Sequence, residues 1–271
     1  MITAPDVHEI DAEGVRFYRD ALETLNAVGV EYMVGGTFSL QPYTGLVRDT
    51  KDFDIFLRAE ALDRALDALA EAGYRTEIPF PHWLAKAYDG DTFVDLIFSS
   101  GNGIARVDDE WFAHAPESTV LGMSVLLCPP EETIWSKAFI MERERYDGAD
   151  VAHLLRCSGT TLDWNRLLRR FEGFDRVLLS HLTLFGFIYP HERNIVPNWV
   201  MFKLMRSLLR ELETDPTEEL VCRGTYLSRS QCLPDLEEWG YQDARVLSDG
   251  TMTEEQTDIW TQAALEQAEV R

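Results

Sequence analysis

The sequence has no long hydrophobic run, no excess of basic residues and no clustered cysteines, and each absence excludes a class of protein. The longest apolar stretch, residues 177–189, is interrupted by Ser180, His181 and Thr183, so it is too short to span a membrane. Residues 1–14 lack the basic and apolar segments of a secretory signal. The four cysteines show no C-x-x-C spacing, which argues against a disulfide scaffold and a cysteine zinc site. These absences predict a cytoplasmic protein with no membrane partner.

Charge of one sign dominates the chain. Its 271 residues include 47 acidic and 25 basic side chains, and the formal net charge is −22. Such a chain repels a phosphate backbone at long range, so no bulk nucleic-acid binding is expected. Solubility alone is the simpler reading of this charge. Hydrophobic residues make up 45% of the sequence, which is enough for a packed core and excludes general disorder.

The order of periodic segments predicts an α/β (α+β) first half, residues 1–130, and a mostly helical region, residues 131–271. Apolar residues recur at helical spacing over 13–28 and 60–72. Alternating or apolar runs bounded by turns predict strands, and an Asp-Gly-Asp turn predicts a hairpin. The predicted strands are residues 31–34, 51–57, 74–78, 83–88, 92–98 and 122–127. From residue 131 to about residue 205 the pattern is helical, with breaks near residues 157–161 and at Pro190.

Three features of the first half suit one chemistry. A Gly-Gly-Thr turn at residues 35–37 lies between a predicted strand and a short helix, where backbone amides can approach a phosphate. Asp52 and Asp54 are two residues apart on a predicted strand, so both point to one side and together suit Mg²⁺. Asp95 is an acid within an apolar strand, which calls for a partner or a cation. Taken singly, each has a simpler reading: an ordinary turn, a solvated strand face, and a strand-end cap or solvent-facing acid.

The order of these features resembles the nucleotidyltransferase superfamily, the fold of DNA polymerase beta and the aminoglycoside nucleotidyltransferases. Among its branches the sequence is most similar to the minimal and abortive-infection toxin-type nucleotidyltransferases, over about residues 30–155. The resemblance rests on residues 34–37, 48–55 and 93–96, with a looser match at residues 137–150. It implies a nucleotidyltransferase-type mixed sheet with flanking helices.

The resemblance also implies site residues, each by position in this sequence. The residues that would bind the nucleoside triphosphate are Gly35, Gly36 and Thr37. Asp52 and Asp54 would ligate Mg²⁺ (or Mn²⁺), and Asp95 would complete the metal site or activate the acceptor hydroxyl. Lys137 would neutralise phosphate charge and Asp150 would support its helical motif. Arg48 and Lys51 lie beside the acids and could contact phosphates; a salt bridge to Asp49 or a surface position is the alternative, favoured for Lys51.

The expected activity is therefore Mg²⁺-dependent transfer of a nucleoside monophosphate from an NTP to an acceptor hydroxyl. The acceptor is left open among a small molecule, a protein side chain and an RNA end. A basic segment at residues 223–229 is one candidate to contact it, and a salt-bridged loop is the simpler reading. The alternative function is a catalytically silent binding protein on the same fold, acting in a toxin–antitoxin or regulatory pair.

Overall fold

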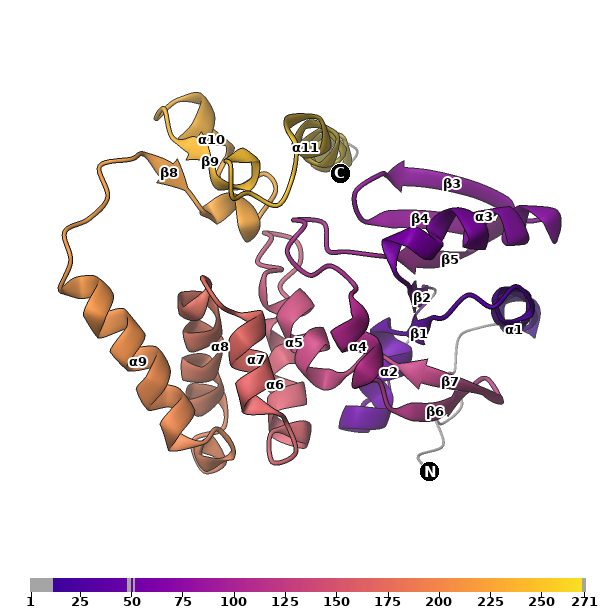
Figure 1. Ribbon diagram of the computed structural model, residues 1–271, viewed down its shortest axis with the longest axis horizontal. Coiled ribbons are helices and arrows are strands. Elements are labelled where there is room, and N and C mark those ends of the chain that lie inside the picture. Colours follow the sequence, from indigo (N-terminus) through magenta and orange to yellow (C-terminus); the bar gives the residue numbers. More distant parts are fainter. Residues whose placement is uncertain (1–11, 48–49, 51, 270–271) are drawn as a thin grey trace. The chain divides into compact units, whose positions relative to one another are not determined.

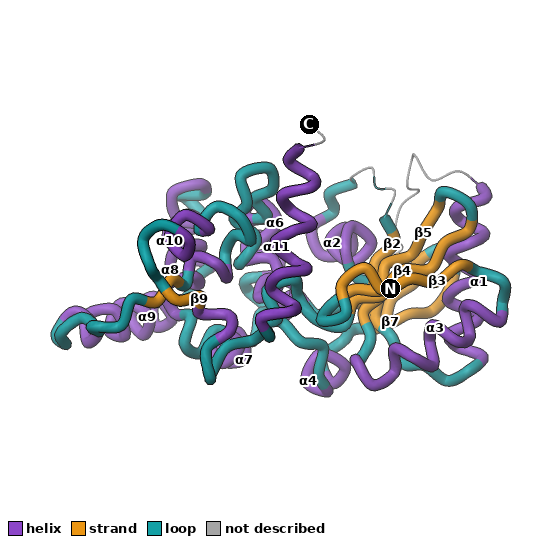
Figure 2. The backbone as a smooth tube through the Cα atoms, turned by 90° about the horizontal axis from the view of Figure 1, so that it is seen from above, coloured by secondary structure: helices purple, strands orange, loops and turns teal. Residues whose placement is uncertain are grey.

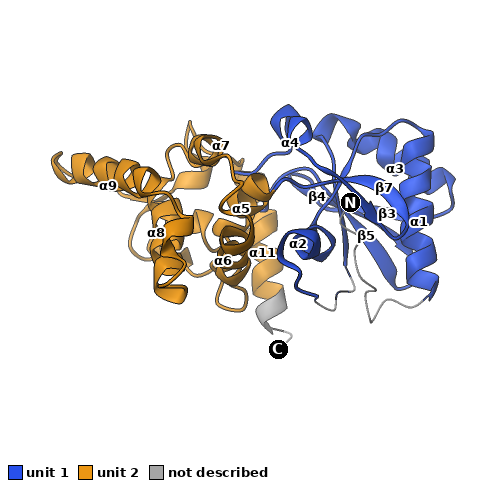
Figure 3. Cartoon of the chain, turned by 90° about the horizontal axis from the view of Figure 1, so that it is seen from below, with its two compact units in different colours: residues 1–129 blue, residues 130–271 orange. Residues whose placement is uncertain are grey.

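The computed structural model describes residues 12–47, 50 and 52–269. The chain divides into two compact units, and the boundary along the sequence lies between Pro129 and Pro130 (Figure 3). Within the described residues, every helix is too short or too polar to cross a lipid bilayer. Each unit is described by itself below.

A seven-stranded mixed sheet forms the first unit (Figures 1 and 2). The strands lie in the order β3-β4-β5-β2-β1-β7-β6, with β1 parallel to β7 and β2 parallel to β5. All the other neighbouring pairs are antiparallel. The strands are β1 (Met33–Val34), β2 (Phe53–Phe56), β3 (Arg75–Phe80), β4 (Leu84–Asp89), β5 (Thr92–Ile97), β6 (Glu117–Val120) and β7 (Met123–Leu127). This architecture confirms the predicted mixed sheet with flanking helices.

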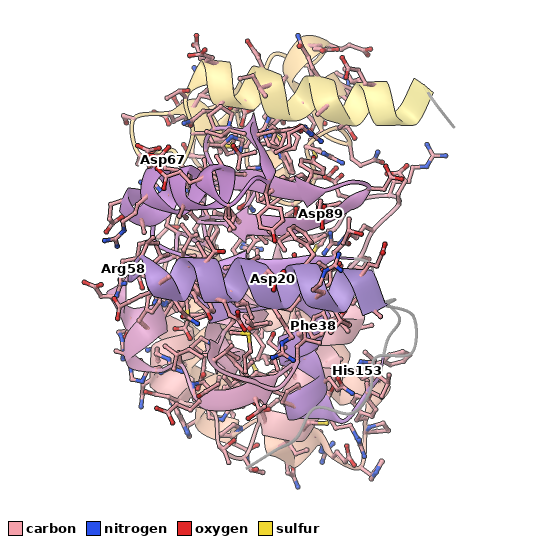
Figure 4. All side chains as sticks on the ribbon, turned by 90° about the vertical axis from the view of Figure 1, so that its right-hand side faces the viewer. Asp20, Phe38, Arg58, Asp67, Asp89 and His153 are labelled. Atoms are coloured by element: carbon pink, nitrogen blue, oxygen red, sulfur yellow. The ribbon has the colours of Figure 1, made fainter. Side chains whose placement is uncertain are left out.

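Two helices cover one face of this sheet, α1 (Ala12–Ala27) and α3 (Leu62–Glu71). Figure 4 looks onto them, with Asp20 marking α1 and Asp67 marking α3. Their apolar sides pack on the alternate strand residues that face them, and Tyr18 of α1 stacks on Phe53 of β2 at 4.7 Å between ring centroids. Phe53 is fully buried. Since side chains alternate along a strand, the acidic neighbours of Phe53 point to the opposite face.

The strands and helices of the first unit differ from the sequence predictions mainly in length. The predicted strand at residues 31–34 is reduced to Met33–Val34. The helix after the glycine turn was predicted to end at Leu40, before a loop that contains Pro42. The observed helix, α2 (Gly36–Thr44), continues four residues further and includes that proline. A proline this close to the end of a helix costs only one backbone hydrogen bond. Strand β6 and a short helix, α4 (Asp109–Ala113), were not predicted.

The second unit is mostly helical. Its helices are α5 (Pro130–Ala138), α6 (Gly148–Ser158), α7 (Trp164–Arg170), α8 (Asp175–Ile188), α9 (Asn198–Leu212), α10 (Leu233–Glu237) and α11 (Glu254–Glu269). Helix α5 packs on α6 and α7, and α6 packs on α8. Between α9 and α11 two short parallel strands pair, β8 (Val221–Cys222) and β9 (Gln242–Asp243). The chain leaves the helical pattern at residues 139–147 and 171–174, two breaks that the sequence pattern did not indicate.

Candidate active site

A row of charged side chains crosses the face of the sheet opposite α1 and α3. In the register of the strands, Asp54 of β2 lies beside Asp95 of β5, and Asp95 lies beside Lys86 of β4. Residues paired in this way project from the same face, about 5 Å apart. Asp52 precedes β2 and is exposed, and its position two residues before Asp54 directs it to this same face. Sheet pairing thus places Asp54 beside Asp95, while Asp52 precedes the paired part of β2.

The glycine turn adjoins Asp54 at the end of β1. The backbone N–H of Gly35 donates to the carbonyl of Asp54 at 2.9 Å. Gly36 has a φ of +55°, and a Cβ added there would overlap the Oδ2 atom of Asp54. A Cβ added at Gly35 would overlap the ring of Phe56. Both positions therefore require glycine, because the backbone of the turn lies directly against the side chains of β2.

Helix α2 begins at this turn. Gly35 is its N-cap and provides no side-chain cap, while Thr37 lies in its first turn. The first amides of any helix lack partners within that helix and give this end a partial positive charge. Since α2 also packs against β2, its positive end adjoins the strand that carries Asp54. Such an end suits the phosphates of a nucleotide.

Asp95 is held by Lys86. The Nζ atom of Lys86 lies 2.5 Å from Oδ1 of Asp95 and 3.8 Å from the ring centroid of Phe93. Burial raises the pKa of Asp95, the bond and charge of Lys86 oppose that rise, and the charge of Asp52 adds to it; the net direction is upward. Asp95 is therefore a carboxylate with a stronger affinity for a proton than an exposed aspartate has.

The donor set of this face fits a hard divalent cation. Three carboxylates offer only oxygen ligands, and Mg²⁺ prefers oxygen ligands. Among the described residues, the oxygen atoms of Asp52, Asp54 and Asp95 do not all lie within 4.8 Å of one another, so a shared ion would draw them closer. Asp95 keeps a second carboxylate oxygen besides the one that accepts from Lys86. We conclude that the residues suit Mg²⁺ or Mn²⁺ in type and in strand position.

Lys137 and Asp150 belong to the second unit, where they form an ion pair. The Nζ atom of Lys137, in the last turn of α5, lies 2.8 Å from Oδ2 of Asp150 and 2.7 Å from Oδ2 of Asp147. Burial would raise the pKa of Asp147, but bonds from Arg145 and the charge of Lys137 outweigh it and lower this pKa. Glu142, in contrast, accepts a hydrogen bond from Ser228 at 2.5 Å.

Two residues near the predicted site are not described. Arg48 and Lys51 lie outside the described residues. The basic segment at residues 223–229 belongs to the second unit, where Arg229 lies 3.6 Å from a carboxylate oxygen of Glu142 and 4.6 Å from the ring centroid of Trp260. The roles assigned to all these residues stay predictions.

Sequence analysis missed Lys86, although a signal for it was present. The turn at Gly90 and Asp91 joins β4 to β5, and Asp89 pairs with Thr92 across it. Counting back from this two-residue loop places Lys86 directly opposite Asp95. Since the hairpin was predicted from the sequence, its register could also have predicted the ion pair between Lys86 and Asp95.

The chain matches the model of one protein family. The model of the family described as "Nucleotidyl transferase of unknown function (DUF2204)" matches residues 15–176, which is more than half of the chain. No curated protein gives a significant match.

Several solved structures are similar to the chain. The antibiotic-resistance factor ANT(2'')-Ia is 16% identical, with 67% of this chain and 100% of that chain covered and a TM-score of 0.45. The lincosamide antibiotic adenylyltransferase LnuA, solved with lincomycin, is 15% identical, with coverages of 54% and 96% and a TM-score of 0.38. An antigenic nucleotidyltransferase-like protein from Paracoccidioides brasiliensis is 14% identical, with coverages of 64% and 94% and a TM-score of 0.39.

Proposed function

The chain belongs to the nucleotidyl transferase family that its residues 15–176 match, and from that membership we propose that it transfers a nucleoside monophosphate from an NTP to an acceptor hydroxyl. The observation that carries this proposal is the alignment of Asp54 with Asp95 in adjacent parallel strands, beside the glycine turn. Phosphoryl-type transfer needs positioned negative ligands and a cradle for phosphate more than it needs covalent help from the protein.

In this proposal the first unit binds the nucleotide. The amides of Gly36 and Thr37 would contact the triphosphate at the positive end of α2. Gly35, whose own N–H donates to Asp54, would hold the turn against β2. Asp52, Asp54 and Asp95 would hold Mg²⁺ or Mn²⁺, which neutralises charge on the phosphates when it is bound. Arg48, outside the described residues, would contact the same phosphates.

The proton of the acceptor hydroxyl needs a base. The acceptor oxygen attacks the α-phosphorus, the bond from that phosphorus to the bridging oxygen of the β-phosphate breaks, and pyrophosphate leaves. As the alternative to completing the metal site, Asp95 would accept this proton, because burial raises the pKa of this carboxylate and makes it a better proton acceptor than an exposed aspartate. Lys86 would keep the carboxylate oriented while it is ionised.

Lys137 supports the finer assignment to the abortive-infection toxin-type branch, which stays a prediction. Its side chain is only 14% exposed, and its ammonium is oriented by Asp147 and Asp150. A lysine held in this way loses little side-chain entropy when it meets a phosphate, so Lys137→Ala should slow transfer by one or more orders of magnitude.

The acceptor stays open among the three classes given by the sequence. A net charge of −22 disfavours a large nucleic acid and leaves a small molecule, a protein side chain or an RNA end. The exposed Arg223 is the residue of the 223–229 segment that we expect to contact an anionic acceptor.

The test uses NTPs labelled at either the α- or the γ-phosphate. The protein is incubated with each NTP, Mg²⁺ and a cell extract, and labelled products are identified. Nucleotidyl transfer puts the α-label on the acceptor and the γ-label in pyrophosphate. A γ-label on the acceptor would instead identify a kinase, and intact NTP binding without any labelled acceptor would favour the silent binding protein.

Two double variants give a matched comparison. Asp52→Asn with Asp54→Asn should abolish Mg²⁺-dependent NTP binding and labelling. Asp63→Asn with Asp67→Asn removes the same charge from exposed positions on α3, which covers the opposite face of the sheet, and should leave both unchanged. Equal NTP affinity in the two folded variants contradicts the proposal.

A further inference from the structure

Two cysteines and an aspartate of the second unit form another group of ligand atoms. Cys222 is the last residue of β8, Cys232 is the N-cap of α10, and Asp235 lies within α10. One ligand atom from each of these residues lies within 4.8 Å of the other two. Among the histidine, cysteine, aspartate and glutamate residues that the structure describes, this group of three has its ligand atoms within that distance of one another. We propose that Cys222, Cys232 and Asp235 bind a zinc ion.

The separations suit tetrahedral coordination. The Sγ atom of Cys222 lies 3.7 Å from Oδ1 of Asp235. With Zn–S near 2.3 Å and Zn–O near 2.1 Å, a tetrahedral ion separates its sulfur and oxygen ligands by about 3.6 Å. Two thiolates select Zn²⁺ over Mg²⁺, because sulfur is a soft ligand and Mg²⁺ prefers oxygen. Three protein ligands leave the fourth position for water or another donor.

The backbone around the cluster leaves room for the two sulfurs. A Cβ added at Gly224 would overlap the Sγ atom of Cys232 and would lie 3.5 Å from that of Cys222. The strand that carries Cys222 is paired with β9, and Thr225 donates to the carbonyl of Cys222 at 3.2 Å. Cys222 is 7% exposed, so this ligand is already buried in a fixed segment. A prearranged ligand set of this kind binds a metal without a large ordering cost.

The charges around the cluster influence how readily the thiol of Cys232 loses its proton, a step that metal binding requires. Burial, Cys222 and Asp235 raise the pKa of Cys232 to about 11, and the charge of Arg245 opposes them. Arg245 is fully buried and is paired with Asp243 at 2.7 Å. A divalent cation would displace the thiol proton and compensate the three negative ligands.

The experiment measures bound zinc in the full chain without an affinity tag. The protein is reduced, stripped with a chelator, equilibrated with Zn²⁺ and analysed by native mass spectrometry and elemental analysis. We expect one zinc ion per chain, and with Co²⁺ an intense sulfur-to-cobalt absorption band. Cys222→Ser and Cys232→Ser should each weaken binding by more than about 100-fold, a loss beyond that seen for outer-shell partners.

Matched controls separate this site from other metal-binding groups. Cys157, an exposed cysteine at the end of α6, provides the control variant Cys157→Ser, which should keep both the zinc ion and the cobalt band. Asp235→Asn should weaken binding while circular dichroism stays unchanged. The zinc site is independent of the proposed transferase activity, so NTP binding should be retained in all these variants.

Three outcomes overturn the proposal. The first is that reduced wild-type protein binds no more zinc than the Cys222→Ser, Cys232→Ser double variant. The second is zinc binding without a sulfur-to-cobalt band, which would assign the ion to other groups. The third is a Cys222–Cys232 disulfide in the isolated protein, with no zinc binding after its reduction.

Discussion

At the scale of single residues, Asp95 is a group whose pKa is altered by its surroundings. Burial raises its pKa, and the amine of Lys86 is the partner that opposes this rise. A protonated carboxyl group cannot ligate a cation, so a raised pKa means that metal affinity is lost at a higher pH as the solution is acidified. Lys86 thus controls the pH at which Asp95 becomes a ligand.

Lys86→Met should raise the pKa of Asp95 further. The variant removes the donor and the charge that oppose burial, while the methionine keeps much of the apolar stem. A carboxyl-carbon NMR titration of Asp95 measures the shift directly, and the pH midpoint for loss of Mg²⁺-dependent NTP binding should move upward with it. Lys86→Arg keeps a positively charged donor, so the pKa of Asp95 should stay close to its value in the wild-type protein. An unchanged Asp95 midpoint in Lys86→Met would show that the ion pair does not control this carboxylate.

Gly36 provides a second prediction at this scale. Gly36 and Gly29 both have left-handed backbones, with φ of +55° and +66°. Either glycine-to-alanine change should therefore cost about 1–2 kcal/mol of unfolding free energy. Only at Gly36 would the new methyl group also overlap Asp54, because nothing lies within 4 Å of a Cβ at Gly29. Gly36→Ala should weaken NTP binding at least about 10-fold, a loss of ~1.4 kcal/mol, and Gly29→Ala should not.

Urea unfolding and calorimetric titration with NTP measure the two effects separately. If Gly36→Ala and Gly29→Ala bind NTP with the same affinity, the close approach of the turn to Asp54 has no role in nucleotide binding.

At the scale of helices, α5 and α7 are joined by buried ion pairs. The carboxylate of Glu131 accepts from the guanidinium of Arg166, and Glu132 lies 3.3 Å from Arg166 and 3.1 Å from Arg170. Glu131 and Glu132 are 3% and 0% exposed. Burial raises the pKa of Glu132, and the two arginines oppose it. These glutamates lie in the first turn of α5, where acids are favourable at any helix, and their arginine partners are on α7.

Arg166→Met should destabilise the protein by about 3–5 kcal/mol, because it leaves buried carboxylates without their partner. Arg176→Met is the matched control, since Arg176 and Glu211 form an exposed pair with side chains 61% and 58% exposed. Removing an exposed pair should cost no more than ~1 kcal/mol. Urea unfolding followed by circular dichroism compares the variants, and equal losses would mean that the buried pairs contribute nothing specific.

At the scale of the whole molecule, the net charge of −22 determines the response to salt. Like charges repel across a folded protein, and salt screens that repulsion. The screening length falls from about 30 Å at 0.01 M to about 8 Å at 0.15 M. Adding NaCl over this range should therefore raise the melting temperature, by roughly 2–4 °C for each kcal/mol of repulsion removed.

Calorimetry with NaCl, and with sucrose at the same osmolality as the control, tests this expectation. A melting temperature that stays level or falls with NaCl would show that local ion pairs outweigh the net repulsion.

Local patterns in the sequence were sufficient for many elements. The alternation of residues 51–57 identified the buried side of β2, because side chains along a strand alternate between faces. Asp89, Gly90 and Asp91 identified the turn between β4 and β5, and with it the register that contains Lys86 and Asp95. The length of α2 was less predictable, because proline is usually read as the end of a helix.

Pairing between distant segments was decided only by the tertiary structure. Asp54 and Asp95 are on strands separated by α3, β3 and β4, so no local pattern determines that they lie side by side. Glu131 and Glu132 find Arg166 and Arg170 because α5 packs on α7.

The cysteines show the difference between spacing in the sequence and position in the folded chain. Their spacing in the sequence argued against a zinc site, yet folding of the chain between Cys222 and Cys232 brings their sulfurs together with Asp235. The sequence by itself determined the charge, the periodic elements and the residue types of the proposed site, since these depend on neighbours a few positions apart. Strand register, helix packing and ligand clusters depend on residues far apart in the chain, and only the packed structure decided them.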